Sequence, residues 1–256
     1  MSTCLSVNLN KIALIRNSRD TRIPSVVDAA VTAIEAGAQG ITVHPRPDMR
    51  HIRPGDVYDL AELLQKPDYR DIEFNIEGNP YAEAEDNGYP GFMKLIDDVR
   101  PDQATLVPDD PNQLTSDHGW DLTGESNRLK AVVDQLKAWE ARVSLFMDPD
   151  DHQLTLASRL GTDRIEFYTG PYADHYGTPE GDNILTSFVR AGQHASTLGL
   201  GINAGHDLNQ ENLARFCGDV PNVLEVSIGH AIVTDALWLG LGETVSRYRN
   251  ILDALT

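Results

Sequence analysis

Short apolar segments alternate along the chain with longer segments that have the periodicity of a helix. Runs rich in Val, Ile, Leu and Phe predict eight strands, at residues 5–9, 40–43, 71–76, 103–107, 142–147, 164–168, 199–203 and 224–228. Segments of helical periodicity predict the helices, at residues 24–37, 55–65, 90–99, 126–140, 151–160, 183–198, 209–216 and 231–254. The strands read as apolar throughout, which is typical of a parallel sheet covered by helices.

Eight consecutive strand–helix units in 256 residues predict a single-domain TIM (β/α)8 barrel that spans residues 1–256. An open, doubly wound sheet is the competing architecture because it has the same alternation. No Gly-x-Gly-x-x-Gly motif follows the first predicted strand, which argues against a dinucleotide-binding version of that fold. No low-complexity segment or linker interrupts the chain, so we expect one domain.

The composition limits the classes of partner. The formal net charge is −18, from 39 acidic and 21 basic side chains, which disfavours binding to nucleic acid or to an anionic membrane surface. No apolar run approaches the length of a membrane span. The two cysteines, Cys4 and Cys217, have no disulfide or metal-ligand spacing, and no secretory signal is recognised. We therefore expect a cytoplasmic protein.

Ionisable residues recur where the predicted strands end. In a barrel the carboxyl ends of the strands surround the active site, so these residues are candidates for function. A lone ionisable residue at a strand end is more often solvated or paired, but this chain repeats the pattern at several ends. Four of the eight histidines lie at or just beyond a strand end, namely His44, His51, His206 and His230. The other four are expected on the surface, namely His118, His152, His175 and His194.

Basic residues are concentrated after the first two predicted strands. Seven of the 21 basic residues lie there, namely Lys11, Arg16, Arg19, Arg22, Arg46, Arg50 and Arg53. Arginine binds phosphate and carboxylate groups with a two-pronged geometry, so the excess indicates an anionic ligand. The alternative is that these arginines form salt bridges with the acidic surface.

Two glycine–histidine pairs and two glutamates are further candidate functional residues at the carboxyl ends of the predicted strands. Gly205-His206 and Gly229-His230 are expected to stand where a strand turns into a helix, and such a helix start favours an anion. Glu77 and Glu166, together with the imidazoles, could carry out several proton transfers. We find no serine or cysteine nucleophile motif, Cys4 lies at the wrong end of its strand, and no predicted strand contains a lysine.

These residues resemble the pyridoxine 5′-phosphate synthase family of vitamin B6 biosynthesis. The matching segments are Val7-Asn8-Leu9-Asn10-Lys11-Ile12-Ala13, Leu14-Ile15-Arg16-Asn17, Gly40-Ile41-Thr42-Val43-His44-Pro45-Arg46, Arg50-His51-Ile52, Asn75-Ile76-Glu77, Asn203-Ala204-Gly205-His206 and Ser227-Ile228-Gly229-His230-Ala231. Each segment is short, but their shared order from the first strand to the last is specific.

The resemblance implies a (β/α)8 enzyme without a cofactor or metal, typically a cytoplasmic homo-octamer. Its partners would be two small phosphorylated substrates. It would condense 1-deoxy-D-xylulose 5-phosphate with 3-amino-2-oxopropyl phosphate, giving pyridoxine 5′-phosphate, phosphate and water. Both substrates carry a phosphate, in agreement with the basic loops and the two glycine–histidine pairs.

The resemblance also implies roles for individual residues. His44 and Glu77 would be general bases, His206 a general acid, and Glu166 would stabilise the transition state. The positions that match the aminoketone phosphate site are Asn8, Arg19, Gly229 and His230. The positions that match the deoxyxylulose phosphate site are Asn10, Lys11, Arg46, His51 and Thr115.

The chain departs from the family pattern at several of these places. Asn10-Lys11 stands where many members have Asp-His, which would remove a proton-transfer histidine. Asp207, at a substrate-binding position, replaces a glycine and puts a negative charge near a phosphate. The loop at 78–90 is longer than usual. The loop at 108–121, which carries Thr115, is expected to fold over the substrates with Gly119 as its hinge.

Two other functions are open on the sequence. A metal-dependent barrel isomerase or hydrolase acting on a phosphorylated sugar would use His44, Glu77, Glu166 and His206 as ligands. The chain has no His-x-His pair at a strand end, and the arginines near these residues would repel a cation. A barrel that binds a phosphorylated ligand without catalysis is the other, but it would not need the acid–base residues.

Overall fold

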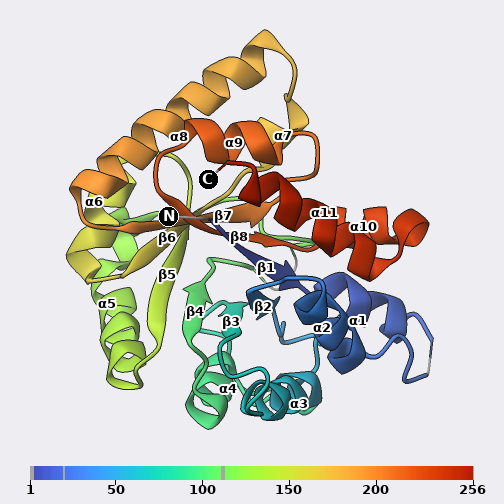
Figure 1. The fold of residues 1–256 in the computed structure, drawn as a ribbon. Helices are drawn as coiled ribbons and strands as arrows, with labels where there is room; N and C mark the ends of the chain where they lie inside the picture. The colour runs from blue at the N-terminus through green and yellow to red at the C-terminus, as the bar shows by residue number, and fades with distance from the viewer. Residues whose placement is uncertain (1–2, 20, 111–112, 256) are drawn as a thin grey trace.

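The strands of the protein form one closed barrel, in which each strand is parallel to its two neighbours (Figure 1). The computed structural model describes residues 3–19, 21–110 and 113–255. The strands are β1 (Cys4–Asn8), β2 (Gly40–Val43), β3 (Glu73–Gly78), β4 (Gln103–Leu106), β5 (Arg142–Met147), β6 (Arg164–Phe167), β7 (Gly201–His206) and β8 (Val223–Ile228). Ser6 pairs with Gly40 of β2 on one side and with Ser227 of β8 on the other, which closes the ring. The predicted TIM barrel is confirmed.

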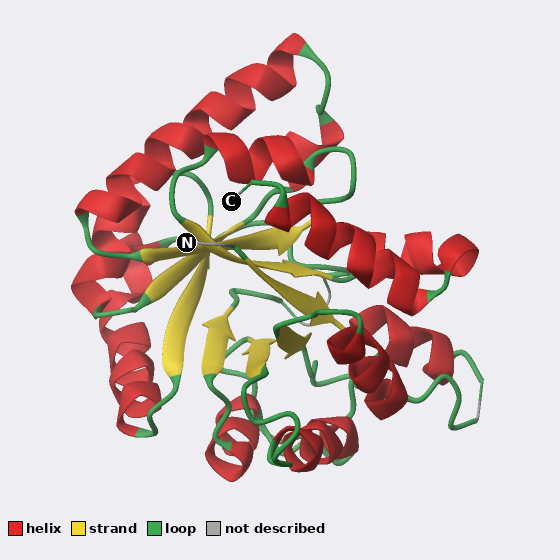
Figure 2. Ribbon diagram, viewed as in Figure 1, coloured by secondary structure: helices red, strands yellow, loops and turns green. Residues whose placement is uncertain are grey.

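Helices surround the barrel on its outer face (Figure 2). They are α1 (Asn10–Asn17), α2 (Val26–Glu35), α3 (Pro54–Leu64), α4 (Phe92–Val99), α5 (Leu122–Ala138), α6 (Asp151–Leu160), α7 (Gly170–Asp174), α8 (Pro179–Thr197), α9 (Leu213–Asp219), α10 (His230–Leu239) and α11 (Leu241–Asp253). In the described part of the chain, no helix is both long and apolar enough to cross a membrane.

Side chains cap the starts of several helices. Asp121 accepts the backbone N–H of Thr123 at the start of α5, and Asp150 accepts that of Gln153 at the start of α6. Each contact satisfies a backbone donor that has no partner within its own helix. Residue Gly161 follows α6 with a φ of 81°, a conformation that favours glycine and ends the helix.

Two predicted elements need correction, and two helices were not predicted. Strand β7 runs through His206, and α9 begins only at Leu213, so Gly205-His206 does not precede a helix start as expected. The single helix predicted at 231–254 is two helices, α10 and α11, separated by Gly240 with a φ of 82°. The short helices α1 and α7 were not predicted; α1 follows β1 after one residue, which hides its start.

The strands alternate between the two faces of the barrel, contrary to the prediction that they are apolar throughout. In β1, Leu5 and Val7 are fully buried in the core cluster with residues of the helices, whereas Ser6 lies on the other face and hydrogen-bonds to Thr42 at 2.7 Å. Asn203 of β7 donates to Gln103 of β4 at 3.3 Å. Because β4 and β7 are not neighbours, this hydrogen bond crosses the interior, which is therefore lined by polar side chains.

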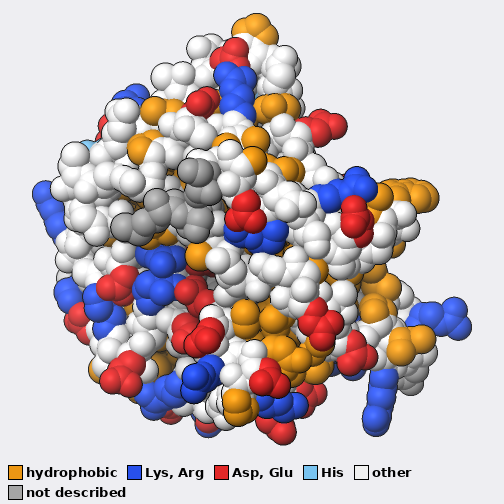
Figure 3. All heavy atoms as spheres, in the orientation of Figure 1, with side chains coloured by type: hydrophobic (Ala, Val, Ile, Leu, Met, Phe, Trp, Pro, Cys, Tyr) orange, Lys and Arg blue, Asp and Glu red, His pale blue; other side chains and the backbone are white. Residues whose placement is uncertain are grey.

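Exposed apolar side chains gather on α1 and α10, which contact each other. Trp238 is 84% exposed and Leu237 68% exposed at the end of α10, and Leu14 and Ile15 are exposed on α1. Figure 3 shows hydrophobic side chains along the right-hand edge of the molecule, where these helices lie, beside interspersed acidic and basic groups elsewhere on this face. A contiguous apolar surface of this kind is typical of a protein–protein interface.

Candidate active site

The carboxyl ends of the strands bring together residues from six strands or the segments that follow them. The group consists of Asn8 on β1, His44 after β2, Glu77 on β3, Asp109 after β4, Glu166 on β6 and His206 on β7. Closure of the barrel therefore brings the four predicted catalytic residues together, at the carboxyl ends of the strands or inside the barrel just below those ends. Their individual catalytic roles stay predictions.

Glu77, on β3, contacts residues at the ends of β1 and β2. Its Oε2 accepts a hydrogen bond from the side-chain amide of Asn8 at 3.3 Å and is 3.8 Å from Nδ1 of His44. Its side chain is only 12% exposed. Burial raises the pKa of Glu77 to about 8, and the negative charge of Asp109 adds to this rise. A carboxyl group with a pKa near neutrality can both accept and donate a proton.

His44 is held by its backbone and is almost completely buried. Its backbone N–H donates to the side-chain oxygen of Asn10 at 2.8 Å, so the predicted substrate residue Asn10 also fixes the end of β2. Burial, with the positive charges of Arg46 and Arg50, holds the pKa of His44 well below its usual range. His44 is therefore neutral at pH 7 and has a free lone pair, as a general base requires.

Glu166 lies deeper in the barrel than Glu77. It is 3% exposed, and its Oε2 has no hydrogen-bond partner among the described residues. Burial raises the pKa of Glu166 well above its usual range, and the nearby charges of Glu77 and Glu225 add to the shift. The shift favours the neutral carboxylic acid form of Glu166, which can donate a hydrogen bond.

His206 contacts the β4–α5 loop on one side of its ring and the next residue in the chain, Asp207, on the other. Its Nε2 is 2.9 Å from Oγ1 of Thr115, and its Nδ1 is 2.5 Å from the carboxylate of Asp207. Tyr168 packs edge-on against the imidazole, with the ring centroids 5.5 Å apart. The unexpected aspartate thus contacts the proposed general acid, and Thr115 closes over it from the loop.

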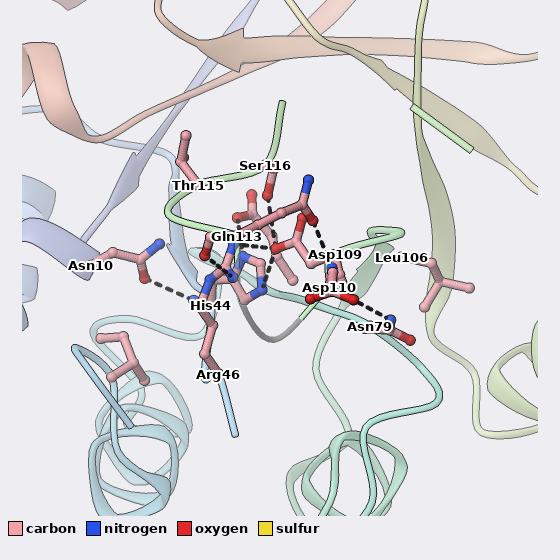
Figure 4. A network of polar contacts seen from close by, with 12 residues as sticks. Asn10, His44, Arg46, Asn79, Leu106, Asp109, Asp110, Gln113, Thr115 and Ser116 are labelled. Atoms are coloured by element: carbon pink, nitrogen blue, oxygen red, sulfur yellow. Dashed lines mark hydrogen bonds and ion pairs between the residues drawn. The ribbon is translucent and has the colours of Figure 1, made fainter. Parts of the chain in front are cut away.

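Arg46 and Asp109 form an ion pair buried beside His44 (Figure 4). The same carboxylate oxygen, Oδ2, accepts from Ser116 at 3.0 Å. The sequence prediction missed Asp109, although it follows the fourth strand by three residues. Because Asp109 lies just beyond the end of β4, the strand-end rule that selects the other residues applies to it as well.

The other predicted arginines are partly explained by salt bridges. Arg16 makes a bidentate pair with Asp56, with 2.9 Å between Nη2 and Oδ2, and Arg50 pairs with Asp48 at 2.7 Å. Arg16 and Arg50 thus form the salt bridges that the alternative interpretation expects, whereas Arg46 pairs with a carboxylate buried in the mouth and its phosphate-binding role stays a prediction. Arg16 is 8% exposed, so it stabilises the first two loops rather than facing a ligand.

The remaining predicted substrate residues have mixed positions. Gly229 directly precedes α10, and a Cβ there would approach Asn8 to 3.0 Å, so only glycine leaves this helix start open. His230 and Arg19 are exposed, and Lys11 is half-buried on α1. His51 is buried beside His44, its ring accepting the N–H of Ile52 at 2.9 Å, and burial lowers the pKa of His51 to about 3.

The long loop after β3 forms one wall of a cavity beside His44. The cavity has a volume of about 350 Å³, and its lining includes Tyr81 and Tyr89 as well as Arg46 and Asp109. Residue Gly119, predicted as a hinge of the next loop, packs on the end of β5, where a Cβ would lie 2.3 Å from the backbone nitrogen of Asp148. This close approach requires glycine; a hinge role is not tested by it.

The PdxJ family model, described as "Pyridoxal phosphate biosynthesis protein PdxJ", matches residues 5–254. The chain belongs to the PdxJ family. A relative from Xylella fastidiosa (strain 9a5c), named pyridoxine 5′-phosphate synthase, is 52% identical over 253 residues, covering 99% of this chain and 96% of the relative. A relative of the same name from Xanthomonas oryzae pv. oryzae (strain PXO99A) is 53% identical over 252 residues, covering 98% and 97%.

Solved structures of more distant proteins share the barrel of this PdxJ-family chain. Tryptophan synthase from M. tuberculosis superposes with a TM-score of 0.62 at 12% identity, over 98% of this chain and 93% of that one. Phosphoribosyl anthranilate isomerase from Thermus thermophilus gives 0.60 at 11% identity, over 99% and 100%. At such low identity these likenesses concern the fold alone.

Among the residues that the structure describes, no three His, Cys, Asp or Glu side chains are grouped to hold a metal ion.

Proposed function

We propose that this PdxJ-family protein acts as a pyridoxine 5′-phosphate synthase. It condenses 1-deoxy-D-xylulose 5-phosphate with 3-amino-2-oxopropyl phosphate to give pyridoxine 5′-phosphate, inorganic phosphate and two molecules of water. The observation that carries the proposal is the pair of buried groups Glu77 and His44, 3.8 Å apart, which have shifted pKa values of opposite direction. One is a carboxyl poised near neutrality and the other is a neutral imidazole, as repeated proton transfers require.

The residues around this pair have separate tasks in the proposal. His44 and Glu77 remove protons as the amine attacks the ketone and the ring closes. His206 donates a proton to a leaving oxygen, and Glu166, as a neutral acid below them, stabilises charge in the transition state by a hydrogen bond.

Two regions of the mouth would hold the phosphates. The open helix start at Gly229-His230, with Asn8 and Arg19, takes the aminoketone phosphate. Asn10, Lys11, Arg46, His51 and Thr115, with Asp207 beside them, surround the deoxyxylulose phosphate. Arginine side chains and the backbone N–H groups at a helix start both donate strong hydrogen bonds to phosphate, which supports this division.

The direct test is incubation of the purified protein with both substrates. We expect pyridoxine 5′-phosphate to form, identified by its absorbance and mass, together with inorganic phosphate. Reactions that lack either substrate are the controls and must give no product. Folded protein that gives no product with both substrates would contradict the proposal.

We also propose that the protein is a cytoplasmic homo-oligomer, an octamer by the family resemblance. The apolar surface of α1 and α10 supports self-association, because 84% of the Trp238 side chain and 68% of Leu237 would otherwise face water. Cys4 and Cys217 are both free, as in proteins of a reducing compartment.

Trp238→Glu is expected to break this association, because it puts a charge in place of the most exposed large side chain of the apolar surface. The particle mass, measured by light scattering after size-exclusion chromatography, should fall from an oligomer to smaller species. Gln193→Glu adds the same charge on the exposed side of α8 and should leave the mass unchanged. An unchanged mass in Trp238→Glu would remove this surface from the interface.

A further inference from the structure

Asp109, in the loop after β4, contacts two residues that follow β2, His44 and Arg46. It is 7% exposed. Three groups approach its Oδ2: the guanidinium of Arg46, the hydroxyl of Ser116 at 3.0 Å and Nε2 of His44 at 3.5 Å (Figure 4). The ion pair with Arg46 favours the ionised form of this carboxyl, although burial raises the pKa of Asp109 above its usual range.

The ring of His44 therefore lies between two carboxyl groups of different character. On its Nε2 side is Asp109, an acceptor paired with an arginine. On its Nδ1 side is Glu77, at 3.8 Å, which is longer than a hydrogen bond. Because a neutral imidazole has one N–H and one lone pair, the side with the stronger acceptor takes the N–H. The lone pair is then at Nδ1 and is not used in a hydrogen bond with Glu77.

We infer that Asp109 is a positioning residue that fixes His44 in the tautomer with the proton on Nε2, so that Nδ1 is the atom that removes protons from the substrate. The inference rests on the proposed function, since it assigns the base its reacting atom. In the substrate-free protein, Arg46 competes for the same oxygen, which accounts for the 3.5 Å separation; such contacts often shorten when substrate binds. A carboxylate in this position also stabilises the imidazolium that forms after proton transfer.

A structural role is the competing explanation, because Asp109 also anchors the loop that carries Thr115 and Ser116. Loss of that anchor would weaken substrate binding and raise KM. Loss of the tautomer would lower kcat without raising KM, because removal of the carboxylate leaves Arg46, the proposed phosphate contact, in place. The two explanations thus predict different kinetic parameters for one variant.

Asp109→Asn is the variant that separates them, because it keeps the shape and removes the charge. We expect kcat to fall about 100-fold with KM within about twofold of wild type. Asp109→Glu should recover part of kcat. Asp68→Asn makes the same chemical change on an exposed aspartate after α3 and should keep the wild-type rate. A rise in KM alone, or wild-type kinetics in Asp109→Asn, would overturn the inference.

The pH dependence of kcat gives a second readout. The charged and titratable groups around His44 are Glu77 on β3, Asp109 after β4, Arg46, Arg50 and His51 after β2, and His206 on β7. Removing the carboxylate on the Nε2 side makes protonation of His44 less favourable, and it also lowers the pKa of Glu77, to which the charge of Asp109 contributes. The acid limb of the kcat profile should therefore move to lower pH in Asp109→Asn, and an unmoved limb would count against the inference.

Nitrogen-15 NMR of histidine-labelled, substrate-free protein tests the tautomer without any reaction. The His44 signals, assigned by their loss in His44→Gln, should show the proton on Nε2 in wild type and a mixture of tautomers in Asp109→Asn. A proton on Nδ1 in wild type would overturn the inference. Because this measurement uses no substrate, its result stands apart from a failure of the protein to make pyridoxine 5′-phosphate.

Discussion

Glu77→Gln is expected to reduce turnover by about 10³- to 10⁴-fold while both substrates still bind. Glutamine keeps the size of the side chain and an oxygen that can accept from Asn8, but it cannot take up or release a proton. The rate of pyridoxine 5′-phosphate formation and the heat of substrate binding are the two measurements. A variant that retains the wild-type rate would remove Glu77 from the chemistry.

The same substitution has a consequence for stability. In the folded protein the pKa of Glu77 is raised to about 8, whereas in the unfolded chain it returns towards its ordinary value of 4.5. The folded state therefore binds the proton more tightly, and its stability decreases as the pH rises from about 4.5 through 8. Glutamine mimics the neutral carboxyl group at every pH and removes this loss.

The free energy of unfolding should thus favour Glu77→Gln over wild type more strongly at pH 9 than at pH 6. Urea unfolding at the two pH values measures the difference. Glu62→Gln, on the exposed side of α3, is the control and should show no such pH dependence. An equal effect of Glu77→Gln at both pH values would mean that Glu77 is ionised in the folded protein at pH 6.

Gly205→Ala is expected to destabilise the protein by about 3 kcal/mol or more. Residue Gly205 lies against β8, and a Cβ there would be 1.9 Å from the carbonyl oxygen of Ser227. Neither strand can move away without breaking the pairing of β7 with β8, in which Gly205 is the partner of Ser227. The displaced strand would also carry His206 out of its contact with Thr115.

Urea unfolding measured by circular dichroism checks this prediction. Gly124→Ala is the matched control, because a Cβ at that position of α5 meets nothing within 4 Å. The control should keep or slightly raise the stability, since alanine favours a helix by about 0.5–1 kcal/mol relative to glycine. Equal midpoints for Gly205→Ala and wild type would show that the barrel can widen at this point.

The sequence predicted the barrel and its strands because apolar runs and helical periodicity are local signals. Strands β2 and β5 and helix α6 lie at the predicted residues. The end of β7 was predicted wrongly because Asn203-Ala204-Gly205-His206 has the composition of a turn, whereas pairing with β8 keeps it extended. That pairing is a contact between segments distant in the sequence, and no local pattern contains it.

The sequence predicted where the residues of the candidate site lie, but it did not predict which charged side chains pair with each other. The strand-end rule found His44, Glu77, Glu166 and His206, since parallel strands bring their carboxyl ends together. It could not tell that Arg46 pairs with Asp109 or that Asp207 contacts His206. Those contacts depend on which loop folds towards which neighbour, and charge counting treats a paired arginine and a free one alike.

The alternation of side chains along each strand divides the barrel into two concentric regions, an outer one that packs against the helices and an inner one that faces the axis. Apolar side chains such as Leu5 and Val7 face outward and hold the sheet to its helices, whereas the polar side chains of the same strands face the axis. A substitution that exchanges one axial side chain for another of similar size therefore leaves the packing of the outer region unchanged, whereas one that displaces a strand, such as Gly205→Ala, does not. The inner face can accept new chemistry one residue at a time, while stabilising changes in the outer region can be added independently.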